Sequence, residues 1–418
     1  MKVFKFGGGV LNSAEAVKKI PSVINLYPDD PLIIVVSAFG KTTNALEDLI
    51  SARLEEKNSE VIFQEIFDYH LGIIKGLFPQ GYSSERDFRT GLREMLMGEL
   101  PASPAEFYDR VICFGELISS QIVCKFLEQE GYHILWTDIR EVIKTSSNFR
   151  EAAVDWQTSR KNAGLILAPV LEKTGKNRPL IVTQGFIGSD AAGRSTSLGR
   201  EGSDYTASIL ASLLDADEVI TWKDVPGILN ADPKHFRQTV KLDQISYAEA
   251  TELAYYGAKV IHPKTVKPLQ NKGIPMQVRS FDQPLEPGTL INADATTDTS
   301  IPSFIFKFDQ VLISVSTRDL SFINEQVFND VFSLLSRLFL HVNIIQNSAL
   351  TLSFCVDNHP NTEKLITGLQ EYYTVKYNRG LELITIRHAN EKASELVLQG
   401  KEVLLEQQNR TVVQYVVR

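Results

Sequence analysis

The sequence predicts an α/β protein whose open, mostly parallel sheet carries helices on both faces and is followed by ferredoxin-like α+β modules. Three observations predict this fold. Short apolar strands alternate with helical patterns along the first part of the chain, and a glycine-rich loop joins a strand to a helix near residue 203. A linker rich in Pro, Asp and Thr then precedes a region with the element order βαββαβ.

The first elements indicate the parallel sheet. Residues 2–6 and 32–37 are short apolar runs, and each ends in a loop and is followed by a helical pattern, over residues 13–27 and 42–57. Such alternation is typical of βαβ units. Between about residues 60 and 131 long helical patterns replace the strands. An all-helical excursion inside an α/β domain suits a lid on the substrate side.

A domain boundary is expected in the linker that follows the last strand of the sheet. Four further strands precede it, at residues 132–137, 179–184, 218–222 and 274–280. We therefore expect one domain over residues 1–295 and a second region over residues 305–418.

The second region is expected to contain two small modules. The first consists of strand 311–316, helix 324–338, strands 342–346 and 350–356, helix 362–372 and strand 383–387. A shortened second copy follows, with helix 390–399 and a hairpin of residues 403–406 and 412–417. Paired modules of this kind usually sense ligands or mediate dimers, although the fold alone does not settle their role.

Composition excludes several classes of protein. The formal net charge is −8, with 43% hydrophobic and 22% charged residues, which is typical of a globular protein and argues against nucleic acid as the main partner. No run of about 18 apolar residues is present, so no membrane span is expected. The first residues lack the pattern of a secretory signal, and the cysteines and histidines lack metal-ligand spacing. We expect a cytoplasmic protein without a metal held by its own side chains.

The loop between residues 185 and 202 predicts a phosphate site. It carries five glycines and leads into a helix at Ser203 and Asp204. Glycine lets backbone N–H groups approach a ligand, and a helix N-terminus adds partial positive charge. A second strand and a second turn, KDVPGI, follow at once, and parallel strands place such loops at one edge of the sheet. A nucleotide or another phosphate is therefore expected there.

Several side chains near these loops suit phosphoryl transfer. Lys5 ends the first strand just before Gly7, Gly8 and Gly9, where it can reach over a bound phosphate. The sequence SAFGKTTN at 37–44 is not a Walker loop, because Val35 stands where that motif needs glycine. Its threonines can cap a helix or bind a substrate.

The remaining candidates are charged side chains in unusual settings. Glu116 lies in an apolar stretch and needs a partner, either the ammonium group of a substrate or an arginine, and the sequence does not choose between them. Arg200 suits bidentate binding of a carboxylate, and Ser203 suits helix capping and anion contacts. Asp204 can hold Mg²⁺, orient Lys5 or accept from an ammonium group.

Six motifs in order make the chain similar to the aspartate kinases. They are KFGG at 5–8, VVSAFGKTTN at 35–44, FGE at 114–116, GREGSDYTA at 199–207, KDVPGI at 223–228 and GAKVIHP at 257–263. Each is weak alone, whereas their shared order over about 260 residues is specific. The second region resembles the paired ACT regulatory modules of that family more loosely.

The resemblance implies transfer of the ATP γ-phosphoryl group to the β-carboxylate of L-aspartate, giving 4-phospho-L-aspartate on the route to lysine, threonine and methionine. It implies catalytic roles for Lys5 and Asp204. Aspartate would be held by Thr43, Glu116, Arg200 and Ser203. ATP, with Mg²⁺ held mainly by its phosphates, would lie against Lys5, Gly7, Gly8, Lys223, Asp224, Leu229, Lys234 and Lys259.

The chain departs from the family pattern at the nucleotide loops and in the second region. Gly9 and Val10 replace the usual Thr-Ser, Lys223–Asp224 replaces Thr-Asp, and Leu229 replaces a common tyrosine. In the regulatory region the effector contacts implied by the resemblance are Asn343, Gln346 and Asn347. Inhibition by lysine, by threonine or by neither stays open, and the family implies a homodimer formed through the ACT modules.

Two rival interpretations remain. A related amino-acid kinase, acting on glutamate, acetylglutamate, carbamate or UMP, would share the core but generally lacks FGE in this setting and the ACT pair. A catalytically silent amino-acid sensor would keep working ACT modules on an altered KFGGGV loop. Retention of Lys5, Arg200 and Asp204 argues against the silent sensor.

Overall fold

The computed structural model describes residues 1–82, 85–97, 103–172, 179–258 and 261–418. The chain folds into two compact units. The first unit comprises residues 1–228, 241–251 and 260–295, and the second comprises 229–240, 252–259 and 296–418. Two short segments before residue 295 thus cluster with the C-terminal region, and one reason is visible at Asn230. Its carbonyl oxygen accepts from the Phe304 N–H group (2.7 Å), and its side chain donates to the Pro302 carbonyl (2.9 Å).

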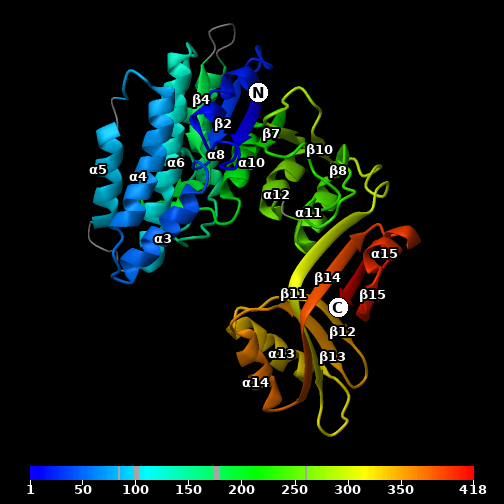
Figure 1. The fold of residues 1–418 in the computed structure, drawn as a ribbon. Coiled ribbons are helices and arrows are strands. Elements are labelled where there is room, and N and C mark those ends of the chain that lie inside the picture. Colours follow the sequence, from blue (N-terminus) through cyan, green and yellow to red (C-terminus); the bar gives the residue numbers. More distant parts are fainter. Residues whose placement is uncertain (83–84, 98–102, 173–178, 259–260) are drawn as a thin grey trace. The chain divides into compact units, whose positions relative to one another are not determined.

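The first unit is built on one eight-stranded sheet (Figure 1). All neighbouring strands are parallel except β9 and β10, so the predicted sheet is confirmed. In spatial order its strands are β3 (Ile134–Thr137), β4 (Leu180–Gln184), β2 (Leu32–Val36), β1 (Lys2–Phe6), β7 (Glu218–Lys223), β9 (Met276–Ser280), β10 (Thr289–Asn292) and β8 (Gln244–Ser246). A short hairpin of β5 (Ile187–Ser189) and β6 (Ser195–Ser197) lies apart from it.

The central strands are apolar because both of their faces are covered. Every residue of β2 (LIIVV) and β4 is buried, as expected for interior strands of a parallel sheet. Helix α6 (Pro104–Gln129) packs on β2, β3 and β4, whereas α10 (Gly202–Leu214) packs on β1, β2 and β7. The other described helices of ten or more residues before residue 295 are α3 (Thr42–Leu54), α4 (Glu60–Leu77), α5 (Glu85–Met97), α8 (Trp156–Ile166), α11 (Tyr247–Tyr256) and α12 (Pro263–Lys272).

The single helix expected over residues 13–27 is instead two short helices, α1 (Ala14–Val17) and α2 (Ile20–Ile24). Pro21 lies in the first turn of α2. Proline has no N–H group to continue a preceding helix but is tolerated in a first turn, so the pattern breaks there. The remaining short helices of the unit are α7 (Ile139–Val142) and α9 (Ala168–Leu171).

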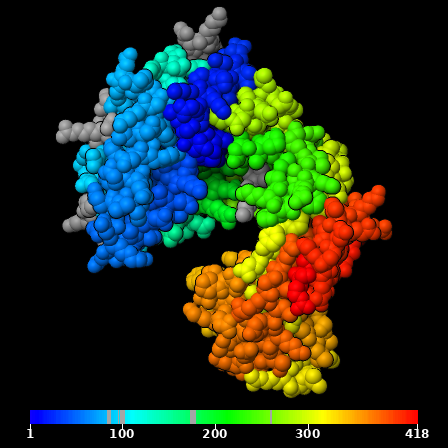
Figure 2. All heavy atoms as spheres, viewed as in Figure 1, coloured from blue at the N-terminus to red at the C-terminus, as the bar shows by residue number. Residues whose placement is uncertain are grey.

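The helical excursion consists of α4, α5 and α6, shown in blue to cyan shades in Figures 1 and 2. Phe67 of α4 stacks on Phe88 of α5, which in turn stacks on Phe114 of α6, with 5.5 Å between ring centroids in both pairs. Ser103 caps α6 by accepting from the Glu106 N–H group. Among the described ranges, no helix has both the length and the apolar character needed to cross a membrane.

The second unit contains one antiparallel sheet shared by two modules. Its order is β12 (Val342–Asn347), β13 (Leu352–Asp357), β11 (Ser303–Ser316), β14 (Thr374–Arg387), β16 (Val412–Val417) and β15 (Val403–Gln408). Helices α13 (Glu325–Arg337), α14 (Thr362–Gln370) and α15 (Glu391–Leu398) complete it. Strands β11 and β14 have 14 residues each and are longer than predicted.

The long strands explain how the shortened module folds. The C-terminal part of β11 belongs to the βαββαβ module, whereas its N-terminal part, residues 303–307, pairs with residues 383–387 of β14. Strand β16 lies on the other side of that part of β14, and β15 completes the edge. The start of β11 therefore supplies the strand that the sequence of the second copy lacks.

Leu46 provides a test of the packing between α3 and α6. Its side chain is fully buried, and Cδ1 lies 3.2 Å from where a side chain on Gly115 would begin. We predict that Leu46→Ala lowers the free energy of unfolding by about 2–5 kcal/mol, because it leaves a cavity. The matched control is Leu165→Ala, on a helical leucine that is 67% exposed, which should change it by less than about 0.5 kcal/mol. Equal effects in urea titrations would contradict this packing.

Candidate active site

A cleft of about 730 Å³ opens in the first unit at the carboxyl ends of the central strands. The structure brings to it most of the residues singled out from the sequence. They are Lys5, Gly7, Gly8, Thr43, Glu116, Arg200, Ser203, Asp204, Lys223 and Asp224. Leu229 and Lys234 belong to the second unit and do not line the cleft, and Lys259 lies outside the described residues.

The loop after β1 requires glycine at position 8. A Cβ atom there would lie 2.5 Å from the carbonyl oxygen of Ala38 and 2.9 Å from that of Gly40. The Gly40 N–H group in turn donates to the carbonyl oxygens of Gly8 and Leu11, at 3.1 Å each. The loops after β1 and β2 thus touch backbone to backbone, and this contact shapes one wall of the cleft.

Asp204 lies between two lysines on the cleft floor. Its Oδ1 atom is 2.8 Å from Lys5 Nζ, and its Oδ2 atom is 3.4 Å from Lys223 Nζ. Only 4% of the Asp204 side chain is exposed. Burial pushes the pKa of this carboxyl upward, but the charges of Lys223 and Lys5 outweigh it and hold the pKa below its usual range. Asp204 is therefore a buried carboxylate, stabilised by the two ammonium groups.

Glu116 of α6 presents a carboxyl oxygen without a partner. Its Oε1 atom accepts from the Ala38 N–H group at 3.3 Å, whereas Oε2 is buried and has no hydrogen-bond partner within the described part of the chain. Burial raises the pKa of Glu116 to about 8, against the smaller opposing effects of the Ala38 hydrogen bond and of Lys5. Among the described residues no arginine pairs with Glu116, and a cationic ligand fits the open oxygen.

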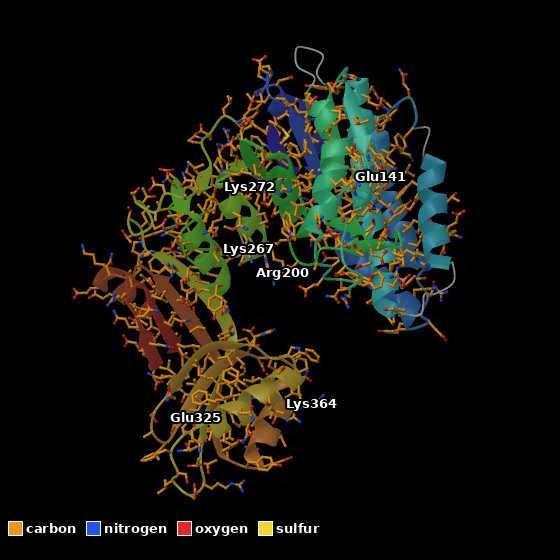
Figure 3. The ribbon with its side chains drawn as sticks, turned by 180° about the vertical axis from the view of Figure 1, so that it is seen from behind. Glu141, Arg200, Lys267, Lys272, Glu325 and Lys364 are labelled. Carbon is orange, nitrogen blue, oxygen red and sulfur yellow. The ribbon has the colours of Figure 1, made fainter. Side chains whose placement is uncertain are left out.

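The entrance to α10 is shaped by unusual backbone conformations. Gly199 has φ = 79°, and Glu201 has φ = 54°, so the chain turns sharply before the helix. A Cβ atom on Gly185 would lie 2.4 Å from Ser203 Cβ, which explains why glycine follows β4. Arg200 lies exposed on the turn (Figure 3), and Ser203 lies in the first turn of the helix.

Sequence reasoning missed one wall of the cleft. The guanidinium of Arg150 lies 4.2 Å from the Tyr108 ring centroid, and the Tyr108 hydroxyl donates to Glu47 Oε1 at 2.6 Å. The backbone N–H group of Arg150 donates to Asp109 Oδ2 at 3.0 Å. The Ser197 hydroxyl also donates to this fully buried carboxylate. No local motif marks these residues, because they come from four separate segments that meet only in the folded unit.

Comparisons with known proteins agree with the site. A family model described as the amino acid kinase family matches residues 1–280. The chain is 31% identical over 396 residues to the lysine-sensitive aspartokinase 3 of Escherichia coli (strain K12), covering 92% of this chain and 86% of that protein. It is 32% identical over 300 residues to a chloroplastic bifunctional aspartokinase/homoserine dehydrogenase 1 of Zea mays, covering 69% of this chain but only 32% of that longer protein.

Solved structures give the same picture. The structure of E. coli aspartokinase III in complex with lysine and aspartate matches with a TM-score of 0.81 and 26% identity, covering 100% of this chain and 96% of that one. The complex of the same enzyme with aspartate and ADP matches with a TM-score of 0.80 and the same identity and coverage.

The chain therefore belongs to the amino acid kinase family, as its parallel sheet and glycine-lined cleft indicate. Within that family it is an aspartokinase, a phosphotransferase with a C-terminal regulatory region. The resemblance and the enzyme class predicted from the six sequence motifs are confirmed.

The contact between the two loops gives a second prediction. Gly8→Ala should reduce kinase activity at least tenfold, because a Cβ at this position collides with two backbone carbonyls that cannot move independently. Gly9→Ala is the matched control, since its Cβ would meet only Asp224 Oδ2, at 4.0 Å. Steady-state rates at saturating substrates, with melting temperatures for both variants, test this. Equal activities for the two variants would contradict it.

Proposed function

We propose that the cleft transfers the γ-phosphoryl group of ATP to the β-carboxylate of L-aspartate, giving 4-phospho-L-aspartate on the route to lysine, threonine and methionine. The observation that carries this proposal is the juxtaposition of a buried lysine–aspartate group, a glycine-lined wall and an unpartnered Glu116 oxygen in one cleft. These are the elements needed to hold phosphate beside an amino acid.

L-Aspartate carries two carboxylates and one ammonium group, and the cleft offers a partner for each charge. The ammonium group pairs with Glu116, whose Oε2 is otherwise unsatisfied. Arg200 and Ser203 at the start of α10 bind the α-carboxylate, and Thr43 in the first turn of α3 lines the same cleft. The β-carboxylate then faces Lys5.

Lys5 stabilises the charge on the transferring phosphoryl group, and Asp204 fixes the Lys5 ammonium group through the 2.8 Å ion pair. The attacking carboxylate is already ionised, so the reaction needs neither a general base nor a phosphoenzyme. Attack forms the bond between a β-carboxylate oxygen and the γ-phosphorus, and the bond to the β,γ-bridging oxygen breaks as ADP leaves with its electron pair.

The nucleotide lies against Gly7, Gly8, Lys223 and Asp224, which line the cleft. Contacts from Leu229, Lys234 and Lys259 stay proposals based on motif position. A Mg²⁺ ion fits if it is held mainly by the phosphates, because Asp204 is shared by two ammonium groups. Among the described residues no cluster of three or more His, Cys, Asp or Glu side chains suits a metal. Bound Mg²⁺ would neutralise phosphate charge.

The proposed effector is an amino acid, lysine or threonine, bound near β12. Asn343 accepts from Lys307 Nζ at 2.7 Å and donates to Gln310 and Asp357, so a ligand would have to displace this network. Gln346 and Asn347 are exposed on the same edge strand, which favours them as effector contacts. Lysine is the first candidate, because the E. coli relative is named as a lysine-sensitive aspartokinase.

A homodimer through the ACT modules and a cytoplasmic location complete the proposal. The second unit exposes large apolar side chains in a monomer: Leu320 at 75%, Phe322 at 73%, Phe339 at 84% and Tyr372 at 72%. Exposed apolar surface of this kind is typical of association sites.

A substrate panel tests the proposed reaction. We predict Mg·ATP-dependent acyl phosphate, trapped as the hydroxamate, with L-aspartate and little with L-glutamate. Lys5→Ala or Asp204→Ala should lower turnover by roughly 10²-fold or more, because each removes preorganised charge from the site. Assays with added lysine and threonine identify the effector. Wild-type rates in both variants would refute the assigned roles.

The raised pKa of Glu116 predicts a pH dependence. Only the ionised carboxylate attracts the substrate ammonium group, and the pKa of about 8 leaves Glu116 mostly protonated at lower pH. kcat/KM for aspartate should therefore rise about tenfold per pH unit below 8 and level off above it. Glu116→Gln should lower kcat/KM and flatten this rise. A flat wild-type profile between about pH 6 and 8 would contradict the assignment.

A further inference from the structure

Lys223 reaches the same carboxylate as Lys5, although the two lysines come from different strands. Lys5 is on β1 and Lys223 ends β7, which pairs with β1 in parallel register. Both ammonium groups approach Asp204, at 2.8 Å and 3.4 Å. The side chains of Lys5 and Lys223 are 9% and 18% exposed, so both lysines hold their charge mostly away from water.

This position places Lys223 at the reacting end of the cleft. Under the proposed function Lys5 contacts the transferring phosphoryl group through its ammonium group. The ammonium group of Lys223 approaches the other carboxylate oxygen of Asp204 and therefore lies close to the same phosphoryl group. The three side chains Lys5, Asp204 and Lys223 together carry one net positive charge. A cation pair bracketing one carboxylate is suited to a multiply charged anion, because cations in a largely desolvated site act strongly on developing charge.

The glycine loop faces the same group. The position of a Cβ on Gly7 lies 3.1 Å from Lys5 Nζ, so the loop backbone lies directly against that ammonium group. Asp224, the neighbour of Lys223, lies beside Gly9. A terminal phosphate held by the loop amides would therefore lie within reach of both lysines.

We propose that Lys223 is a second catalytic cation, which contacts the transferring phosphoryl group together with Lys5 rather than only the nucleotide. This inference rests on the proposed function. The step itself is unchanged: the carboxylate oxygen bonds to the γ-phosphorus, ADP leaves with the electron pair of the broken bond, and Lys223 keeps its protons throughout. Asp204 holds both ammonium groups apart and in place.

Kinetics of charge variants test the proposal. Lys223→Met, which keeps length but removes charge, should lower kcat by roughly 10²-fold, as loss of one preorganised donor typically does. Lys223→Arg should retain more activity than Lys223→Met, and the KM for aspartate should change little. The control is Lys2→Met, on a lysine of the same sheet that is 19% exposed and pairs with Glu218 at 3.0 Å, outside the cleft. Equal rates for Lys223→Met and wild type would overturn the proposal.

A nucleotide series separates this role from a structural one. Calorimetry measures the binding of adenosine, ADP and a non-hydrolysable ATP analogue. Lys223→Met should lower the affinity for the analogue tenfold or more, lower that for ADP less, and leave that for adenosine unchanged. An equal loss for all three ligands would show that Lys223 supports the fold or the nucleoside pocket, and would overturn the proposal. Lys223→Gln, which keeps a donor toward Asp204, replaces the methionine variant if that does not fold.

The hydroxamate assay and the nucleotide series test the proposed acceptor and the role of Lys223 separately. If wild-type protein forms no hydroxamate with L-aspartate, the proposed acceptor is wrong. The nucleotide affinities test Lys223 whatever the acceptor is.

Discussion

Asp204 keeps a negative charge at a position where only 4% of its side chain meets water, and the first unit tolerates this because Lys5 and Lys223 reach it. A buried charge without such partners is strongly destabilising, and removing one partner of a buried pair typically costs about 3–5 kcal/mol. Three elements are thereby tied at one point: β1, β7 and the first turn of α10. This contact fixes both ammonium groups beside the first turn of the helix at the floor of the cleft.

The close backbone contacts around that point have a common purpose. Gly8 against Ala38 and Gly185 against Ser203 allow loops to approach more closely than any side chain permits. Each glycine loses more conformational entropy on folding than another residue would. In return, backbone N–H groups and a helix N-terminus lie close together in one small volume. Glu116 contributes a side chain to the cleft instead of backbone groups. Its carboxyl group is buried without a full set of partners, which raises its pKa to about 8 and leaves an oxygen for a ligand.

The two modules of the second unit share one β-sheet. They do so because β11 and β14 extend through both, and the start of β11 replaces the strand that the shorter copy lacks. The polar network of Lys307, Asn343, Gln310 and Asp357 lies among β11, β12 and β13 of the longer module. Burial lowers the pKa of Lys307, against the attraction of Asp357. This network stabilises the same edge strand that exposes Gln346 and Asn347.

Much of this protein follows from local sequence. Short apolar runs followed by loops predicted strands of the parallel sheet, because period and burial are encoded locally. The order of six short motifs predicted the family and gathered Lys5, Glu116, Arg200, Asp204 and Lys223 as candidates before any contact was known. The divided helix departs from expectation, and Pro21 in the first turn of α2 explains it.

Other features were decided only by the tertiary structure. They include the open oxygen of Glu116, the sharing of Asp204 by two lysines, and the wall formed by Arg150, Tyr108 and Glu47. Each of these arises where segments far apart in the sequence meet. Sequence patterns report how each segment buries its own apolar side chains. Distances between charges depend on how the segments pack against one another, and only the folded chain determines them.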